Sequence, residues 1–144
     1  MKGPDVRRCT AVLTLMAWIV PLGAQSDHVR ERDPDWTASS KDASRSNPFA
    51  SQPNAVAGGQ KLYGQRCSTC HGPDGLGTSR APSLKAADVQ AQTDGTLFWK
   101  IGSGNTRGGM PAFSFLPEAQ RWQLVLHLRA LAVTRAEPWR TDPR

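Results

Sequence analysis

Two cysteines and a histidine lie close together near the middle of the chain, in the run Cys67-Ser68-Thr69-Cys70-His71. This C-x-x-C-H pattern is typical of covalent haem attachment. Two thiols at this spacing, at the end of a helix, can each form a thioether with one vinyl group of the same porphyrin. The histidine that follows then lies under the ring and can bond the iron. The pattern therefore predicts one haem c, bound through Cys67 and Cys70, with His71 as an iron ligand.

Three other uses of paired cysteines fit the chain less well. A structural zinc site usually needs four Cys or His ligands, and without Cys9, which lies in an apparent signal segment, only two cysteines and three histidines remain. A redox pair of the thioredoxin type expects a preceding strand, whereas the upstream residues here have helical spacing. A simple disulfide between Cys67 and Cys70 leaves His71 without a role.

The second axial ligand is sought among the remaining imidazole and thioether groups, which are those of His28, His127 and Met110. His28 falls in a polar leader, and a lone helical histidine such as His127 is more often a packed residue than a ligand. Met110 follows Arg107-Gly108-Gly109 and precedes Pro111, so the backbone can approach a porphyrin closely and is then stiffened. We expect Met110 to be the ligand. The alternative is a loop methionine that fills a gap.

Ligation by His71 and Met110 has a functional consequence. A methionine thioether favours ferrous iron and raises the reduction potential. It also fills the sixth coordination position, which excludes substrate and dioxygen. The predicted ligand set therefore suits electron transfer and argues against an enzyme.

Helical spacing surrounds these residues, and no strand-like alternation of any length is present. A first helix is expected over about 55–67 and a second over 94–101. A third is expected to start near Pro117, a residue suited to the first helical position. Glycine-rich stretches at 72–93 and 102–109 predict loops between them. The chain is thus expected to be all-α.

The first 24 residues have the features of a secretory signal. A basic start is followed by an apolar run from Ala11 to Val20, then by Pro21 and a small-residue cleavage site after Ala24. The run has about half of the roughly twenty residues that span a bilayer. We expect export to the periplasm, where haem of this class is attached. An uncleaved membrane anchor is the alternative.

The remaining chain divides into three parts. Residues 25–53 are polar and are expected to be a disordered leader, because they offer few apolar side chains to bury. The alternative is an arm that wraps the domain through Trp36. A folded domain is expected over 54–134, with a polar tail over 135–144. Such a small domain has a thin core of its own, which a large apolar cofactor would complete.

The net charge of the chain argues against nucleic acid as a partner. The formal net charge of +6 falls to +4 without residues 1–24, because three basic residues and one acidic residue leave with them. This excess can steer an acidic partner at low salt. It is too small for nucleic acid, and no basic stripe is interleaved with aromatic residues.

The order of these motifs resembles the class I (mono-haem) cytochrome c domain, over residues 54 to about 133. The resemblance is carried by five runs in sequence: Gly59-x-x-Leu62-Tyr63, Cys67-Ser-Thr-Cys-His71-Gly72, Ala81-Pro82-Ser83-Leu84, Gly109-Met110-Pro111-Ala112-Phe113 and Trp122 to Leu131. It implies orthogonal helices wrapped around one covalently bound haem.

The resemblance also assigns roles beyond the motif. The Pro82 carbonyl is expected to accept a hydrogen bond from the His71 ring, a contact that would orient the imidazole; the alternative is a plain loop breaker. Gly59 is expected to let the first and last helices cross closely. His127 stands where the family often has an aromatic residue, which leaves the detail of that crossing open. Trp99 is either a donor to a haem propionate or a core residue.

These observations predict a mono-haem electron carrier, a monomer when isolated, that exchanges electrons with a dehydrogenase, an oxidase or another cytochrome. Two alternatives remain at this point. One is a haem c sensor or ligand-exchange protein, in which Met110 leaves the iron. The other is an electron-transfer subunit of a larger oxidase or dehydrogenase complex.

Overall fold

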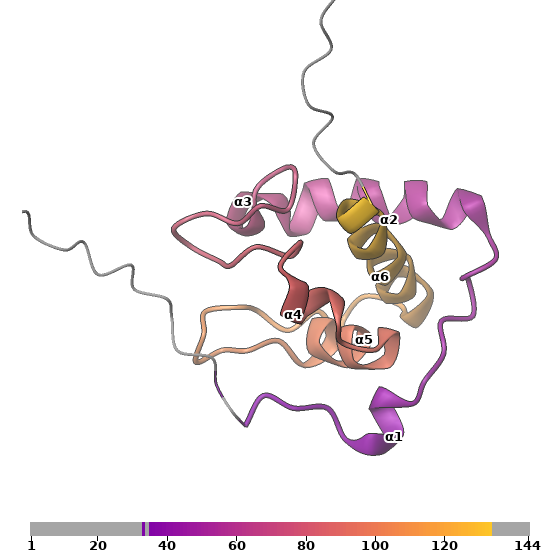
Figure 1. Cartoon of the computed structure of the whole chain (residues 1–144), viewed down its shortest axis with the longest axis horizontal. Helices are drawn as coiled ribbons and strands as arrows, with labels where there is room; N and C mark the ends of the chain where they lie inside the picture. The colour runs from indigo at the N-terminus through magenta and orange to yellow at the C-terminus, as the bar shows by residue number, and fades with distance from the viewer. Residues whose placement is uncertain (1–32, 34, 134–144) are drawn as a thin grey trace, which may run out of the picture.

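The computed structural model describes residue 33 and residues 35–133, which form six helices joined by loops (Figure 1). The helices are α1 (Ser40–Ala43), α2 (Pro53–Arg66), α3 (Ser68–His71), α4 (Ala87–Gln90), α5 (Asp94–Ser103) and α6 (Glu118–Val133). Within these residues there is no strand, only an isolated bridge between Asn105 and Met110. The all-α prediction is confirmed.

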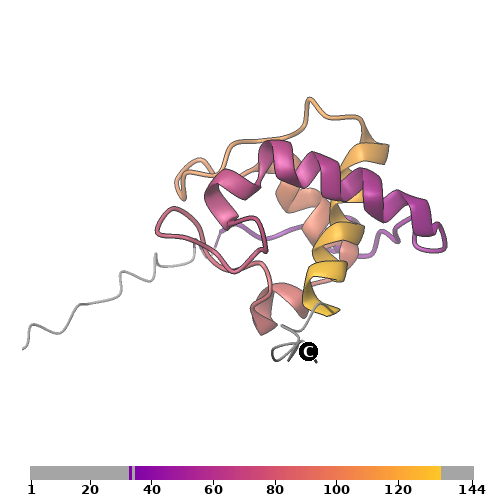
Figure 2. The same cartoon turned by 90° about the horizontal axis from the view of Figure 1, so that it is seen from above.

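Helices α2 and α6 cross at very close range, as Figure 2 shows. Gly59 of α2 lies against the backbone of Gln123 in α6. A Cβ at Gly59 would stand 2.6 Å from the carbonyl carbon of Gln123 and 3.0 Å from Cβ of His127. A real Cβ does not approach other atoms this closely, so only glycine fits. The close crossing expected at Gly59 is present.

The core lies where α2, α5 and α6 meet. Helix α5 starts at a capping Thr93, whose hydroxyl accepts the N–H of Thr96 at 3.1 Å. It buries Leu97, Phe98 and Ile101; Ile101 follows the other two by four and three residues, so all three share one face of the helix. The buried apolar side chains form one cluster, which comprises Tyr63, Leu97, Phe98, Ile101, Phe113, Leu116, Trp122, Leu124, Val125, Leu128 and Leu131.

Residues 35–52, here called the N-terminal arm, are folded onto the domain and run beneath α5 before they rise to α2 (Figure 1). The Asn47 side chain is only 7% exposed and donates to the Trp122 carbonyl at 3.0 Å. Phe49 packs against the core. The prediction of a disordered leader is therefore wrong for this part of the chain.

The other predicted segments fall elsewhere. The signal at 1–24, residues 25–32 of the leader and the tail at 135–144 lie outside the described residues. Among the helices that the structure describes, none combines the length and the apolar character needed to cross a bilayer.

Candidate haem site

The predicted attachment residues occupy a single helical turn at the end of α2. Cys67 ends α2, with its N–H bonded to the Tyr63 carbonyl at 2.9 Å, and α3 follows without a loop. The N–H groups of Cys70 and His71 both donate to the Cys67 carbonyl, at 3.1 and 2.9 Å. Residues three and four apart on a helix lie on one side. Cys67, Cys70 and His71 are therefore neighbours on one face of this turn, which is here called the attachment turn (residues 67–71).

Both cysteines are free thiols, and both are half-buried. Burial and the neighbouring Cys70 raise the pKa of Cys67 to about 11, so that this sulfur stays protonated at neutral pH. No group of three or more His, Cys, Asp or Glu side chains within the described residues could hold a metal ion. Two free thiols three residues apart, followed at once by His71, are a set of groups that fits the two vinyl groups and the iron of one haem.

A hydrogen bond at Nδ1 holds the His71 ring in place. Its Nδ1 lies 2.9 Å from the Pro82 carbonyl oxygen, the contact expected from the resemblance. Because a carbonyl oxygen only accepts, Nδ1 carries the hydrogen and Nε2 keeps a free lone pair. This is the tautomer that binds a metal through Nε2. The hydrogen bond also orients the ring and increases the basicity of the ligand.

The loop that carries Pro82 is folded back tightly onto the attachment turn. The N–H of Leu84 donates to the Gly75 carbonyl at 2.8 Å, and the N–H of Thr78 donates to the Ala81 carbonyl at 2.9 Å. Gly77 has φ of 87°, and a Cβ there would lie 2.8 Å from the carbonyl carbon of Pro82. The glycine therefore allows the close approach that places the Pro82 carbonyl.

Two side-chain hydrogen bonds hold the attachment turn, and neither could be predicted from the sequence. The Tyr63 hydroxyl donates to the Gly72 carbonyl at 2.6 Å, and burial raises the pKa of Tyr63 to about 12. The Thr78 hydroxyl donates to the Cys70 carbonyl at 2.5 Å. Neither hydrogen bond could be predicted, because both depend on how the loop after the turn folds back onto it.

Met110 closes a loop that leaves and rejoins the end of α5. Met110 and Asn105 exchange two backbone hydrogen bonds, of 2.9 and 2.8 Å. Gly104 starts this loop with φ of 64°. The half-buried Met110 side chain packs against the same apolar cluster as Cys67. Met110 and Cys67 thus approach one core from two different segments of the chain.

Of the other predicted candidates, His127 is only 7% exposed and lies at the α2–α6 crossing, with its ring centre 5.0 Å from that of Tyr63. Burial lowers its pKa.

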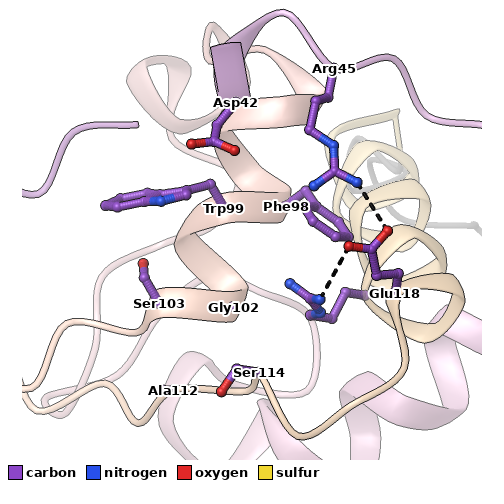
Figure 3. Close-up of a pocket in the computed structure, with 10 residues that line it drawn as sticks. Asp42, Arg45, Phe98, Trp99, Gly102, Ser103, Ala112, Ser114 and Glu118 are labelled. Atoms are coloured by element: carbon purple, nitrogen blue, oxygen red, sulfur yellow. Dashed lines mark hydrogen bonds and ion pairs between the residues drawn. The ribbon is translucent and has the colours of Figure 1, made fainter. Parts of the chain in front are cut away.

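Trp99 borders a cavity of about 420 Å³ between the N-terminal arm, α5 and the start of α6 (Figure 3). None of the predicted haem-binding residues lines this cavity. His28 lies outside the described residues.

The helical fold and the attachment turn define a class I c-type cytochrome domain. A family model described as "Cytochrome C oxidase, cbb3-type, subunit III" matches residues 54–128, which is just over half of the chain. The chain belongs to this family. Its domain is a haem-binding electron carrier and not an enzyme. No curated protein matches the chain.

Proposed function

We propose that this protein is an exported mono-haem cytochrome c that carries single electrons. Cys67 and Cys70 bind the haem through thioethers, and His71 and Met110 are the axial ligands of its iron. The observation that carries the proposal is the 2.9 Å contact between Nδ1 of His71 and the Pro82 carbonyl, beside two free thiols. It leaves the metal-binding nitrogen of His71 available in the correct tautomer.

The residues of this chain would hold the haem in a fixed position. When bound, the haem supplies an iron that changes oxidation state by one electron. His71 is kept in one orientation by Pro82, and the turn that carries it is held by the Tyr63 and Thr78 hydroxyls. A site in which the ligands move little suits electron transfer.

The partner is proposed to be an oxidase complex of the cbb3 type, as the name of the matched family suggests. Leu76 and Phe115 support a docking role, because they are large apolar side chains with 61% and 65% of their surface exposed. One follows the attachment turn and the other follows the Met110 loop. The net positive charge suits an acidic partner.

Export to the periplasm is proposed from the signal-like residues 1–24 alone. N-terminal sequencing of protein recovered from the periplasm tests this proposal. A chain that starts after residue 24 supports it, whereas an intact N-terminus in the membrane fraction supports an uncleaved anchor.

The attachment scheme is tested in a host that matures c-type cytochromes. Cys67→Ala and Cys70→Ala should each weaken haem retention after denaturation, and the double variant should lose retention. Cys9→Ala is the matched control, because Cys9 lies in the predicted signal and should not affect haem content. Full retention in the double variant would contradict covalent attachment.

The axial ligand is tested with Met110→Ala. We expect loss of the methionine-to-iron absorption band of the oxidised protein and rapid binding of carbon monoxide to the reduced variant. The unmodified reduced protein should bind carbon monoxide slowly or not at all. Rapid binding by the unmodified protein would favour the sensor or ligand-exchange function instead.

A further inference from the structure

The N-terminal arm (residues 35–52) fits closely against the first turn of α5. A Cβ at Gly95 would lie 2.9 Å from the carbonyl oxygens of Ala43 and of Arg45, so the arm fits only because residue 95 has no side chain. The Thr93 hydroxyl, which caps α5, also donates to the Ala43 carbonyl at 2.7 Å. The start of α5 and the arm therefore share one set of contacts.

Arg45 extends these contacts from α5 to α6. Its guanidinium lies 4.4 Å from the centre of the Phe98 ring, and its Nη2 lies 3.0 Å from a carboxylate oxygen of Glu118 (Figure 3). Phe98 in turn stacks on Trp122 of α6, with 4.0 Å between the ring centres. A single arm side chain thus connects α5 to the first turn of α6.

The beginning of the arm reaches the other end of α5. The Lys100 ammonium lies 4.3 Å from the centre of the Trp36 ring. A carboxylate oxygen of Asp35 lies 3.8 Å from the guanidinium of Arg107, in the loop that ends at Met110. This exposed pair contributes little stability by itself. Its importance is that it places the arm beside the Met110 loop.

The Met110 loop is built on the last turn of α5. The N–H of Gly104 donates to the Lys100 carbonyl at 3.0 Å where the loop starts. The N–H of Phe113 donates to the Ile101 carbonyl at 3.0 Å where the chain returns. The position of Met110 therefore depends on the position of α5.

We propose that the N-terminal arm is a positioning element for Met110. It holds α5, and with α5 the loop over 104–110, in the orientation in which the thioether occupies the sixth position of the iron. The inference rests on the proposed axial role of Met110. A loosened arm raises the fraction of molecules in which the thioether has left the iron. An external ligand then binds more tightly, because its apparent Kd is the intrinsic value divided by that fraction.

The test uses the full-length matured protein and two arm variants. Gly95→Val inserts a side chain where the arm backbone lies, and Arg45→Ala removes the link to Phe98 and Glu118. Gly64→Ala is the matched control, because a Cβ at Gly64 meets nothing within 4 Å. His127→Ala is a second control that loosens the α2–α6 crossing instead of the arm.

The measurements are the methionine-to-iron absorption band of the oxidised protein and the apparent Kd for added imidazole. The arm variants should weaken the band and bind imidazole about three- to tenfold more tightly. For Arg45→Ala this matches the loss of its cation–π contacts with Phe98 and Trp122 and of its ion pair with Glu118. Gly64→Ala and His127→Ala should leave both quantities unchanged. If Gly95→Val does not fold, Arg45→Ala carries the test.

An unchanged band and unchanged imidazole affinity in the folded arm variants would overturn the positioning role and leave Met110 as the ligand. An equal effect in His127→Ala would show general loosening and overturn it as well. Absence of the band from the unmodified protein would instead remove the axial role of Met110, and the inference with it.

Discussion

The Pro82 carbonyl oxygen lies 2.9 Å from Nδ1 of His71, so the imidazole is oriented by a loop that returns to the helix end that carries it. The two partners are eleven positions apart in the sequence. The geometry of the imidazole therefore depends on how closely this loop folds back, which the absence of a side chain at Gly77 allows.

Gly77→Ala tests this dependence. The variant combines a strained positive φ with a Cβ 2.8 Å from the carbonyl carbon of Pro82, so the loop must move away. We expect about 1–3 kcal/mol less stability. We also expect a higher reduction potential, because a weaker hydrogen bond leaves His71 a less basic ligand. Redox titration is the measurement, with Gly64→Ala as the control. A potential that stays unchanged would contradict the role of Pro82.

Gly59→Ala tests the crossing of α2 and α6. The added methyl group would overlap the backbone of Gln123, which cannot rotate away as a side chain could. We expect about 1–3 kcal/mol less free energy of unfolding, or failure to fold. Gly64→Ala in the same helix should instead gain up to about 1 kcal/mol, because it removes a glycine from an open helical position. Denaturant unfolding of the two variants gives the comparison, and equal stabilities would contradict the close crossing.

The helices and the attachment turn could be predicted because their signals are local. Cys67, Cys70 and His71 share one turn, and the apolar spacing of α5 indicates which side is buried. The choice of Met110 as the proposed second axial ligand also rested on local sequence, since Met110 lies between glycines and a proline. These features need no knowledge of distant contacts.

The N-terminal arm could not be predicted because its contacts are distant and polar. Asn47 bonds to a carbonyl 75 residues away, and Arg45 bonds to a carboxylate 73 residues away. A segment rich in Ser, Asp and Arg resembles a disordered leader when only its own composition is considered. The exception is Trp36, whose large ring did suggest a docked arm.

His127 should make stability depend on pH in a defined direction. Burial lowers its pKa in the folded protein below the usual value of about 6.5, so the unfolded chain binds more protons below that pH. The stability that comes from keeping His127 neutral is fully present above about pH 6.5, and it is lost as the pH falls toward the pKa of His127 in the folded protein. His127→Phe should remove this part of the acid dependence. Unfolding measured from pH 8 to about pH 5 checks it, and parallel curves for the two proteins would contradict it.

Arg129 should be sensitive even to substitution by lysine. Its guanidinium bonds to the Asp94 carboxylate at 2.8 Å and to the backbone carbonyls of Gln90 and Gln92 at 2.8 and 2.5 Å. Lysine keeps the charge but cannot present this planar set of donors. We expect Arg129→Lys to cost about 1–3 kcal/mol of unfolding free energy. A cost below about 0.5 kcal/mol would show that the charge alone is sufficient.

The central claim is tested most directly by mass spectrometry of a tryptic digest. Trypsin cleaves after Arg66 and after Arg80, which releases the fragment 67–80 with Cys67, Cys70 and His71. For protein from a host that matures c-type cytochromes, this fragment should carry the mass of one haem. Recovery of fragment 67–80 with two free or disulfide-bonded cysteines and no added mass would contradict the account.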